Sequence, residues 1–258
     1  MRKNYEQEYL KAKKYYIETE ESLVKVSEKF NIHRGYFSKK LKKEGLIIEN
    51  KQNKVKFNNT VFDVIDTEEK AYWLGFIFAD GYISDQSHFE LSLSSKDFSH
   101  LQKFGKFLNY ESNSKLYGHR CRFVVKDKHF TQSLKRLGCV PRKSLVLEFP
   151  KELIEDLIPH FIRGYSDGDG CLYHIQPKKS LSLSFILLGT EKFLSVCLKH
   201  FKLEHKKIYS YHKSKVYSIQ MSFKQALDVC SYMYKDANIF LERKYEKYNK
   251  IAVLRRNS

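Results

Sequence analysis

The sequence predicts an α+β protein built from two copies of one unit, preceded by a small all-helical domain. Three observations predict this arrangement. A nine-residue segment occurs twice, as WLGFIFADG (Trp73–Gly81) and as IRGYSDGDG (Ile162–Gly170). Each copy is followed by the same order of strand-like and helix-like stretches. The first 49 residues carry helical patterns only. Because internal self-similarity dictates the architecture of a chain, we expect two pseudo-symmetric units that face each other.

The composition indicates a polyanionic partner. The 258 residues include 47 Lys and Arg against 30 Asp and Glu, for a net charge of +17. A charge of this sign and size is typical of proteins that bind nucleic acid, with a polybasic membrane-surface protein as the alternative. No apolar run reaches the ~20 residues of a membrane-spanning helix, and no signal-peptide pattern opens the chain. We therefore expect an intracellular protein that is not bound to a membrane.

The cysteines and histidines predict neither a metal site nor a disulfide framework. The five cysteines are odd in number and widely scattered, without a C-x-x-C pair. Such residues are expected to be reduced and mostly buried as small apolar side chains. The ten histidines form no metal-ligand spacing, and His160, close to the second segment, is interpreted as a packing residue.

Residues 1–49 are predicted to form a helix-turn-helix-like domain. Helices are expected at Tyr5–Tyr16, Ser22–Phe30 and Arg34–Glu44. The residues expected along one buried face are Val26, Phe30, Ile32, Phe37 and Leu41. The last helix would expose side chains that can reach bases or phosphates, namely Arg34, Ser38, Lys39 and Lys42. The alternative is a small helical cap or a protein-contact module.

Residues 50–59 are expected to be a basic linker, because they are polar and lack periodicity. Such a linker would let two binding units engage one duplex together. The two copies of the repeated unit are then expected over residues 60–150 and 151–258.

Both repeated segments are predicted to be helices that pack against each other. The first is expected over Thr67–Ala79, with Thr67 as its N-cap and acidic residues in the first turn. The second is expected to open at Lys151. Gly75 and Gly164 lie at matched mid-helix positions, where glycine costs about 1 kcal/mol relative to alanine. The matched pair therefore predicts a close approach of two helix backbones.

The ends of these two helices are the candidate catalytic and metal site. Gly81 and Gly170 are expected to stop the helices in the left-handed conformation. Asp80 and Asp169 would add full negative charges to ends that already present unpaired carbonyl groups. Two such ends side by side favour hard divalent cations such as Mg²⁺. The alternative is that both aspartates are ordinary helix-ending residues in Asp-Gly turns.

The remaining elements predict two antiparallel sheets, in an αββαββα order that occurs twice. In the first copy we expect strands at Tyr82–Ser84, His88–Ser94, Lys115–Tyr117 and Arg120–Lys126, with helices at Asp97–Leu108 and His129–Leu137. In the second copy we expect strands at Cys171–Ile175, Leu181–Leu187, Lys207–Tyr211 and Val216–Ser222, with helices at Glu191–His200 and Lys224–Tyr234.

One face of each sheet is expected to bind double-stranded DNA. An antiparallel sheet can bury one face and leave the other to solvent, and a two-stranded ribbon fits the major groove. Basic side chains would hold phosphates while other polar side chains read bases. The basic residues expected on these faces are Lys115, Arg120, Arg122, Lys126, Lys178, Lys179, Lys206, Lys207, Lys213 and Lys215.

The two segments resemble the LAGLIDADG motif, and the chain from about Asn59 onwards is similar to single-chain, two-repeat LAGLIDADG homing endonucleases. The second Asp and the final Gly of the motif are present in both copies. Phe78 replaces the first Asp in the first copy. Trp73, Leu74, Arg163 and Ser166 occupy positions that are usually small or aliphatic in the family.

The resemblance implies a monomer whose saddle-shaped sheets grip a long duplex and whose paired helix ends cleave both strands, leaving 3′ overhangs. It implies that Asp80 and Asp169, with the carbonyl groups of Ala79 and Gly168, hold two or three Mg²⁺ ions. It also implies basic residues in the solvent pocket of each active site. The matching segments are PRKS and ERKY, which supply Lys143 and Lys244.

Three alternatives to a free homing endonuclease stay open at this point. The first is a DNA-binding transcriptional regulator on a catalytically inactive LAGLIDADG scaffold. The second is an RNA maturase that assists intron folding with the same basic surface. The third is a homing domain inside an intein, which is disfavoured because no splicing segments are found.

Overall fold

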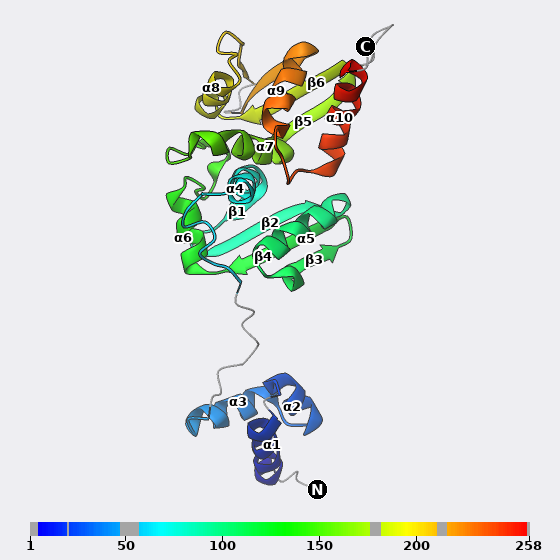
Figure 1. Cartoon of the computed structure of the whole chain (residues 1–258). Coiled ribbons are helices and arrows are strands. Elements are labelled where there is room, and N and C mark those ends of the chain that lie inside the picture. Colours follow the sequence, from blue (N-terminus) through cyan, green and yellow to red (C-terminus); the bar gives the residue numbers. More distant parts are fainter. Residues whose placement is uncertain (1–4, 20, 47–56, 176–181, 211–215, 257–258) are drawn as a thin grey trace. The chain divides into compact units, whose positions relative to one another are not determined.

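The computed structural model describes residues 5–19, 21–46, 57–175, 182–210 and 216–256. The chain divides into two compact units, Met1–Val55 and Lys56–Ser258 (Figure 1).

The described part of the first unit contains helices as its regular secondary structure, as the sequence predicts. Its described residues form α1 (Tyr5–Thr19), α2 (Leu23–Lys29) and α3 (Arg34–Lys43). Ser22 begins α2 as an N-cap whose side chain accepts a hydrogen bond from the Lys25 backbone. This satisfies one of the amide groups that a helix start leaves unpaired. The buried core consists of Tyr9, Ala12, Tyr16, Val26, Ile32, Phe37 and Leu41.

The second unit consists of two repeats with matching topology, and the predicted α+β class is confirmed. In the described part of the first repeat the elements are α4 (Glu68–Asp80), β1 (Gly81–Ile83), β2 (His88–Ser94), α5 (Phe98–Phe107), β3 (Ser114–Tyr117), β4 (Arg120–Lys126) and α6 (Lys128–Arg136). In the described part of the second repeat they are α7 (Ile158–Asp169), β5 (Gly170–Ile175), β6 (Ser182–Gly189), α8 (Glu191–His200), β7 (Tyr209–Ser210), β8 (Tyr217–Ser222), α9 (Lys224–Tyr234) and α10 (Glu242–Arg256). Short 3₁₀ turns lie at Ser95–Asp97, Glu111–Asn113, Lys143–Leu145 and Glu155–Leu157.

The two sheets are antiparallel and have corresponding strand orders, β1-β2-β4-β3 and β5-β6-β8-β7. Figure 1 shows α4 and α7 at the centre of this unit, with one sheet on either side. In the first sheet alternate residues of β2 and β4 point into the core, where Phe89 and Phe123 pack against Phe104 of α5. The other face of the sheet is left open, which is the period-2 pattern that the sequence predicts.

The central feature is backbone contact between α4 and α7. A β-carbon placed on Gly75 would lie 2.0 Å from the Phe161 carbonyl oxygen, and one placed on Gly164 would lie 1.9 Å from the Tyr72 carbonyl oxygen. No side chain larger than hydrogen can occupy either position without separating the helices. The two mid-helix glycines therefore lie where the helix backbones come closest.

Two local predictions are wrong. Helix α7 begins at Ile158 and not near Lys151, because the intervening residues form turns and a 3₁₀ turn; Pro159, which lacks a backbone donor, lies in the first turn of α7. Gly81 and Gly170 are not left-handed. Their φ angles are −73° and −93°, and each starts a strand directly.

Glycine is needed at the two helix ends for a steric reason. A β-carbon would lie 2.6 Å from the Ile77 carbonyl oxygen at Gly81 and 2.3 Å from the Ser166 carbonyl oxygen at Gly170. The chain therefore turns from helix to strand with no room for a side chain.

The C-terminal helix α10 was not predicted from the sequence.

Candidate active site and nucleic-acid face

The two motif aspartates are brought together by the helix contact. At Gly168 of α7, a β-carbon would lie 2.3 Å from the Ala79 β-carbon and 3.0 Å from Asp80 Oδ2. The Asp80 carboxylate therefore lies against the end of α7, one residue before Asp169. Both helix C-termini and both acids meet at one place, as the sequence predicts.

The electrostatics of this place favour a bound cation. Burial and, next, the negative charge of Asp169 raise the pKa of Asp80 to about 6, while Lys244 and Lys143 oppose the shift. Burial also raises the pKa of Asp169, against the effects of Lys143, the Tyr165 hydroxyl and Lys244. The Asp80 residue is exposed, so a ligand can reach its carboxylate, while the neighbouring protein atoms weaken the solvation of the charged form.

The two lysines lie at the two helix ends, and both are buried. Lys143 donates to the carbonyl oxygens of Ala79, at 3.1 Å, and of Gly81. Lys244 donates to the carbonyl oxygens of Ser166, Asp167 and Gly170, at 2.7, 2.7 and 2.5 Å. An ammonium group has three donors. Lys244 therefore uses all of them on the end of α7, whereas Lys143 keeps one that these carbonyl groups do not use.

Both lysines thus act first as caps of the helix ends, where cations are favoured. Their positive charge stays next to the aspartates, but the Lys244 ammonium group is not free to donate to a water molecule. The sequence could not show this difference between the two copies.

A hard divalent cation fits these residues if water and substrate complete its ligand shell. Among the described residues no group of three or more His, Cys, Asp or Glu side chains could hold a metal ion. Mg²⁺ usually keeps several waters and uses one or two carboxylates together with phosphate oxygens, so two carboxylates suffice. Of the predicted carbonyl ligands, that of Ala79 shares its oxygen with the Lys143 ammonium group.

A buried polar network that the sequence analysis missed joins the repeats behind the aspartates. The Tyr72 hydroxyl donates to Asp167 Oδ2 at 2.8 Å and lies 2.9 Å from His100 Nε2. The Leu241 backbone also donates to Asp167 Oδ2 at 2.8 Å. Asp167 occupies the position of the first Asp in the motif. This match is the feature of the sequence from which a role for Asp167 could have been inferred.

The open face of the first sheet is basic, but its charges are partly paired. Lys115 and Arg120 are exposed, as predicted. Arg122 donates to both carboxylate oxygens of Glu90, through Nε at 2.8 Å and Nη2 at 2.5 Å. Arg122, which was predicted to bind DNA, is therefore paired with the carboxylate of Glu90. This pairing was not predicted from the sequence.

The open face of the second sheet is different. An open groove of about 740 Å³ runs from Asp169 along this face, and its lining includes Cys171, Ile186, Leu188 and Gln220. Four cysteines are buried and Cys171 is exposed. The predicted DNA-binding residues Lys178, Lys179, Lys213 and Lys215 lie outside the described residues.

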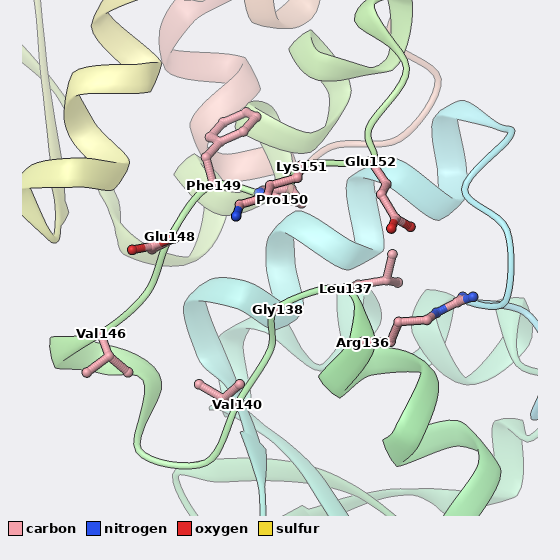
Figure 2. Close-up of a pocket in the computed structure, with 10 residues that line it drawn as sticks. All are labelled: Arg136, Leu137, Gly138, Val140, Val146, Glu148, Phe149, Pro150, Lys151 and Glu152. Atoms are coloured by element: carbon pink, nitrogen blue, oxygen red, sulfur yellow. The ribbon is translucent and has the colours of Figure 1, made fainter.

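A separate pocket of about 320 Å³ lies where the chain connects the two repeats. Figure 2 shows Arg136 and Glu152 at one end of it and Val140 and Val146 at the other. Neither motif aspartate lines this pocket, so it is distinct from the candidate active site.

In the first unit the four residues predicted to bind DNA all lie on α3. Arg34, Lys39 and Lys42 are exposed and Ser38 is half-buried. Lys40, on the same helix, is held by Glu6 of α1 and lies over the Tyr9 ring. In the described residues of both units, no helix is long and apolar enough to cross a membrane.

Comparison with solved structures identifies the architecture. The chain is similar to the LAGLIDADG homing endonuclease I-GzeII in complex with its DNA target, with a TM-score of 0.52 and 13% identity over 72% of this chain and 90% of that one. It is also similar to the meganuclease I-SmaMI bound to uncleaveable DNA (TM-score 0.52, 13% identity, 75% and 91% coverage). The LAGLIDADG meganuclease I-AabMI bound to uncleaved DNA gives a TM-score of 0.51 and 16% identity, with 74% and 92% coverage. No sequence-family model matches the chain, and no curated protein matches it.

The second unit is thus a two-repeat protein with antiparallel sheets on either side of a central helix pair, whose ends carry one acid each. Its fold is that of the LAGLIDADG homing endonucleases, as the motif resemblance implied.

Proposed function

We propose that the protein is a site-specific homing endonuclease that hydrolyses both strands of a long double-stranded DNA target. The observation that carries this proposal is the meeting of Asp80 and Asp169 at the ends of two helices in backbone contact. One acid from each repeat at one place suits a reaction on two strands. The structures with the same fold that are described as bound to DNA support the choice of substrate.

In this proposal Asp80 and Asp169 would hold divalent cations, together with the carbonyl groups of Ala79 and Gly168. Mg²⁺ would supply a nucleophile at neutral pH and stabilise the leaving oxygen. Lys143 and Lys244 fix the carbonyl-rich helix ends and place positive charge beside the acids, where it offsets phosphate charge. The acids must be ionised to act, so Asp80 needs a pH above about 6 in the free protein.

The two open sheet faces would lie in the major groove on either side of the cleavage site. In this arrangement Lys115, Arg120 and Arg122 of the first sheet would contact phosphates or bases. The exposed face of α3 in the first unit, with Arg34, Ser38, Lys39 and Lys42, would add contacts of the helix-turn-helix type. The internal repeat makes a dimer unnecessary, so we propose that the protein acts as a monomer.

The two competing functions are a catalytically inactive DNA-binding regulator and an RNA maturase. Presence of an aspartate at both helix ends favours the nuclease over the regulator. The maturase would use the same basic surface without needing paired acids against opposite strands.

Incubation of the protein with its own flanking genomic DNA and Mg²⁺ tests the proposal. A double-strand break at one position, with 3′ overhangs found on sequencing the ends, is the expected result; EDTA should abolish it. Sequence-specific binding without cleavage would support the regulator. Binding of intron RNA with no effect on duplex DNA would support the maturase.

A further inference from the structure

The open faces of the two sheets can be matched position by position. Gly81 pairs with Leu91 in the first sheet, and Gly170 pairs with Leu187 in the second. The remaining pairings follow in the same register through all four strands. The matched positions are Tyr82 with Cys171, Glu90 with Ile186, Ser92 with Leu188, Val124 with Gln220, Arg122 with Ser218 and Lys115 with Tyr209.

At three of these six matched positions the first face carries a charged side chain, whereas the second face carries none at any of the six. Glu90, Arg122 and Lys115 correspond to Ile186, Ser218 and Tyr209. The two faces share one fold and one placement beside an aspartate, yet they offer different chemistry to a duplex.

The first face complements a G·C pair. In the major groove guanine presents two acceptors, which arginine recognises, and cytosine presents one donor, which a carboxylate recognises. Arg122 and Glu90 are already held together by two hydrogen bonds, with Lys115 opposite Arg122 in the next strand. Donors and an acceptor are thus preorganised side by side.

The second face complements A·T pairs. Ile186 and Leu188 line the groove that runs from Asp169, and both keep accessible surface. Apolar side chains in the major groove contact the thymine methyl group, and glutamine pairs with adenine. Gln220, which is exposed and directly opposite Ile186, supplies that amide.

We infer that the two repeats read half-sites of different composition: the first sheet reads G·C pairs through Glu90 and Arg122, and the second reads thymine methyl groups and adenine through Ile186, Leu188 and Gln220. This inference rests on the proposed binding of double-stranded DNA but not on cleavage.

The test uses base analogues in the target duplex, with affinity measured in EDTA so that cleavage does not enter. The half whose hydroxyl-radical protection weakens in Lys115→Ala is assigned to the first repeat. Replacing thymine by deoxyuridine removes only the methyl group, and replacing guanine by 7-deazaguanine removes only the N7 acceptor. Each replacement is made in one half at a time.

In the half bound by the second repeat, deoxyuridine should raise Kd about fourfold per contacted methyl group, as expected for one buried methylene-sized group. In the half bound by the first repeat, 7-deazaguanine should raise Kd about fivefold or more. The reverse placements should change Kd less than about twofold. Equal effects in both halves, or the opposite assignment, would overturn the inference.

Matched variants tie the effect to the named side chains. Ile186→Ala should reduce the preference for thymine over deoxyuridine, and so should Leu188→Ala, which truncates an exposed side chain and keeps the fold. Val124→Ala, an aliphatic truncation on the first sheet, should leave that preference unchanged. Sequence-specific binding with no change of preference in either variant would overturn the inference alone. Absence of any sequence-specific binding would overturn the proposed function as well.

Discussion

Arg163 of α7 is completely buried and donates a hydrogen bond from Nη2 to Glu68 Oε1 of α4 at 2.6 Å. The same guanidinium donates to the carbonyl oxygens of Met233, at 2.7 Å, and Ile239, at 2.9 Å. Arg163 stands where the LAGLIDADG motif usually has a small or aliphatic residue. The ion pair with Glu68 explains why a large charged residue occupies this position, because it joins the two repeats beside the helix contact at Gly75 and Gly164.

Removal of this arginine should be strongly destabilising. Arg163→Met leaves Glu68 without its cationic partner and two carbonyl groups without a donor, which typically costs about 3–5 kcal/mol. The midpoint of urea unfolding measures the loss. Lys192→Met is the matched control, because Lys192 and Glu148 form an exposed, solvent-screened pair whose removal should leave the midpoint almost unchanged. Similar losses in both variants would contradict the assigned role.

The glycine contact makes a second stability prediction. Gly75→Ala and Gly164→Ala should each destabilise the second unit by about 3 kcal/mol or more, because the new methyl group meets backbone that cannot move aside. Gly35→Ala on α3 is the control: its methyl group would meet only the His33 side chain, at 3.2 Å, and alanine is the better helix former. Retention of stability in Gly75→Ala would show that the helices are less closely packed.

Local sequence patterns were sufficient to predict the main elements of the second unit. The paired motifs and the mid-helix glycines predicted the central helix pair and its two aspartates, and the alternating strands predicted both sheets. Contacts between residues that are distant in the chain, such as Arg163 with Glu68 or Lys244 with the end of α7, could not be predicted. Such contacts produce no repeating pattern in the sequence. The conformation of Gly81 was predicted wrongly because an Asp-Gly pair is common in turns, whereas here the reason for glycine is contact with the preceding helical turn.

The acid pair should reduce stability at neutral pH. Because the pKa of Asp80 is raised to about 6 in the folded protein, the folded state binds more protons than the unfolded state between about pH 4 and pH 6. Stability due to this group is therefore present below that window and falls as pH rises through it. Asp80→Asn should raise the Tm at pH 7.5 by about 2–4 °C, allowing for solvent screening.

The gain in Asp80→Asn should shrink as the pH is lowered from 7.5 towards 5, since the wild-type carboxyl group then becomes neutral as well. Calorimetric Tm values at several pH values check this. Asp85→Asn, at an exposed position in the β1–β2 turn, is the control and should show no such trend. A Tm difference that is independent of pH would contradict the raised pKa.

DNA binding should depend steeply on salt. The logarithm of the association constant should fall by about 0.9 per logarithm of salt for each phosphate that a basic side chain neutralises. Replacement of Arg34, Lys39 and Lys42 together by glutamine should reduce the slope by about 0.9 for each phosphate that is no longer neutralised. Lys192→Gln, on a helix packed behind the second sheet, should leave it unchanged. A flat titration of the wild-type protein would contradict binding through the basic surfaces.

The most direct measurement of the central claim compares binding and cleavage of one target duplex by Asp80→Asn and Asp169→Asn. Each variant should lose double-strand cleavage in Mg²⁺ by at least about 100-fold, or leave only nicked product, while Kd stays within about threefold of the wild-type value. Asp85→Asn should cleave normally. Wild-type cleavage rates in both motif variants would show that the paired helix ends do not form the active site, and equal loss of binding and cleavage would show that they act only in holding DNA.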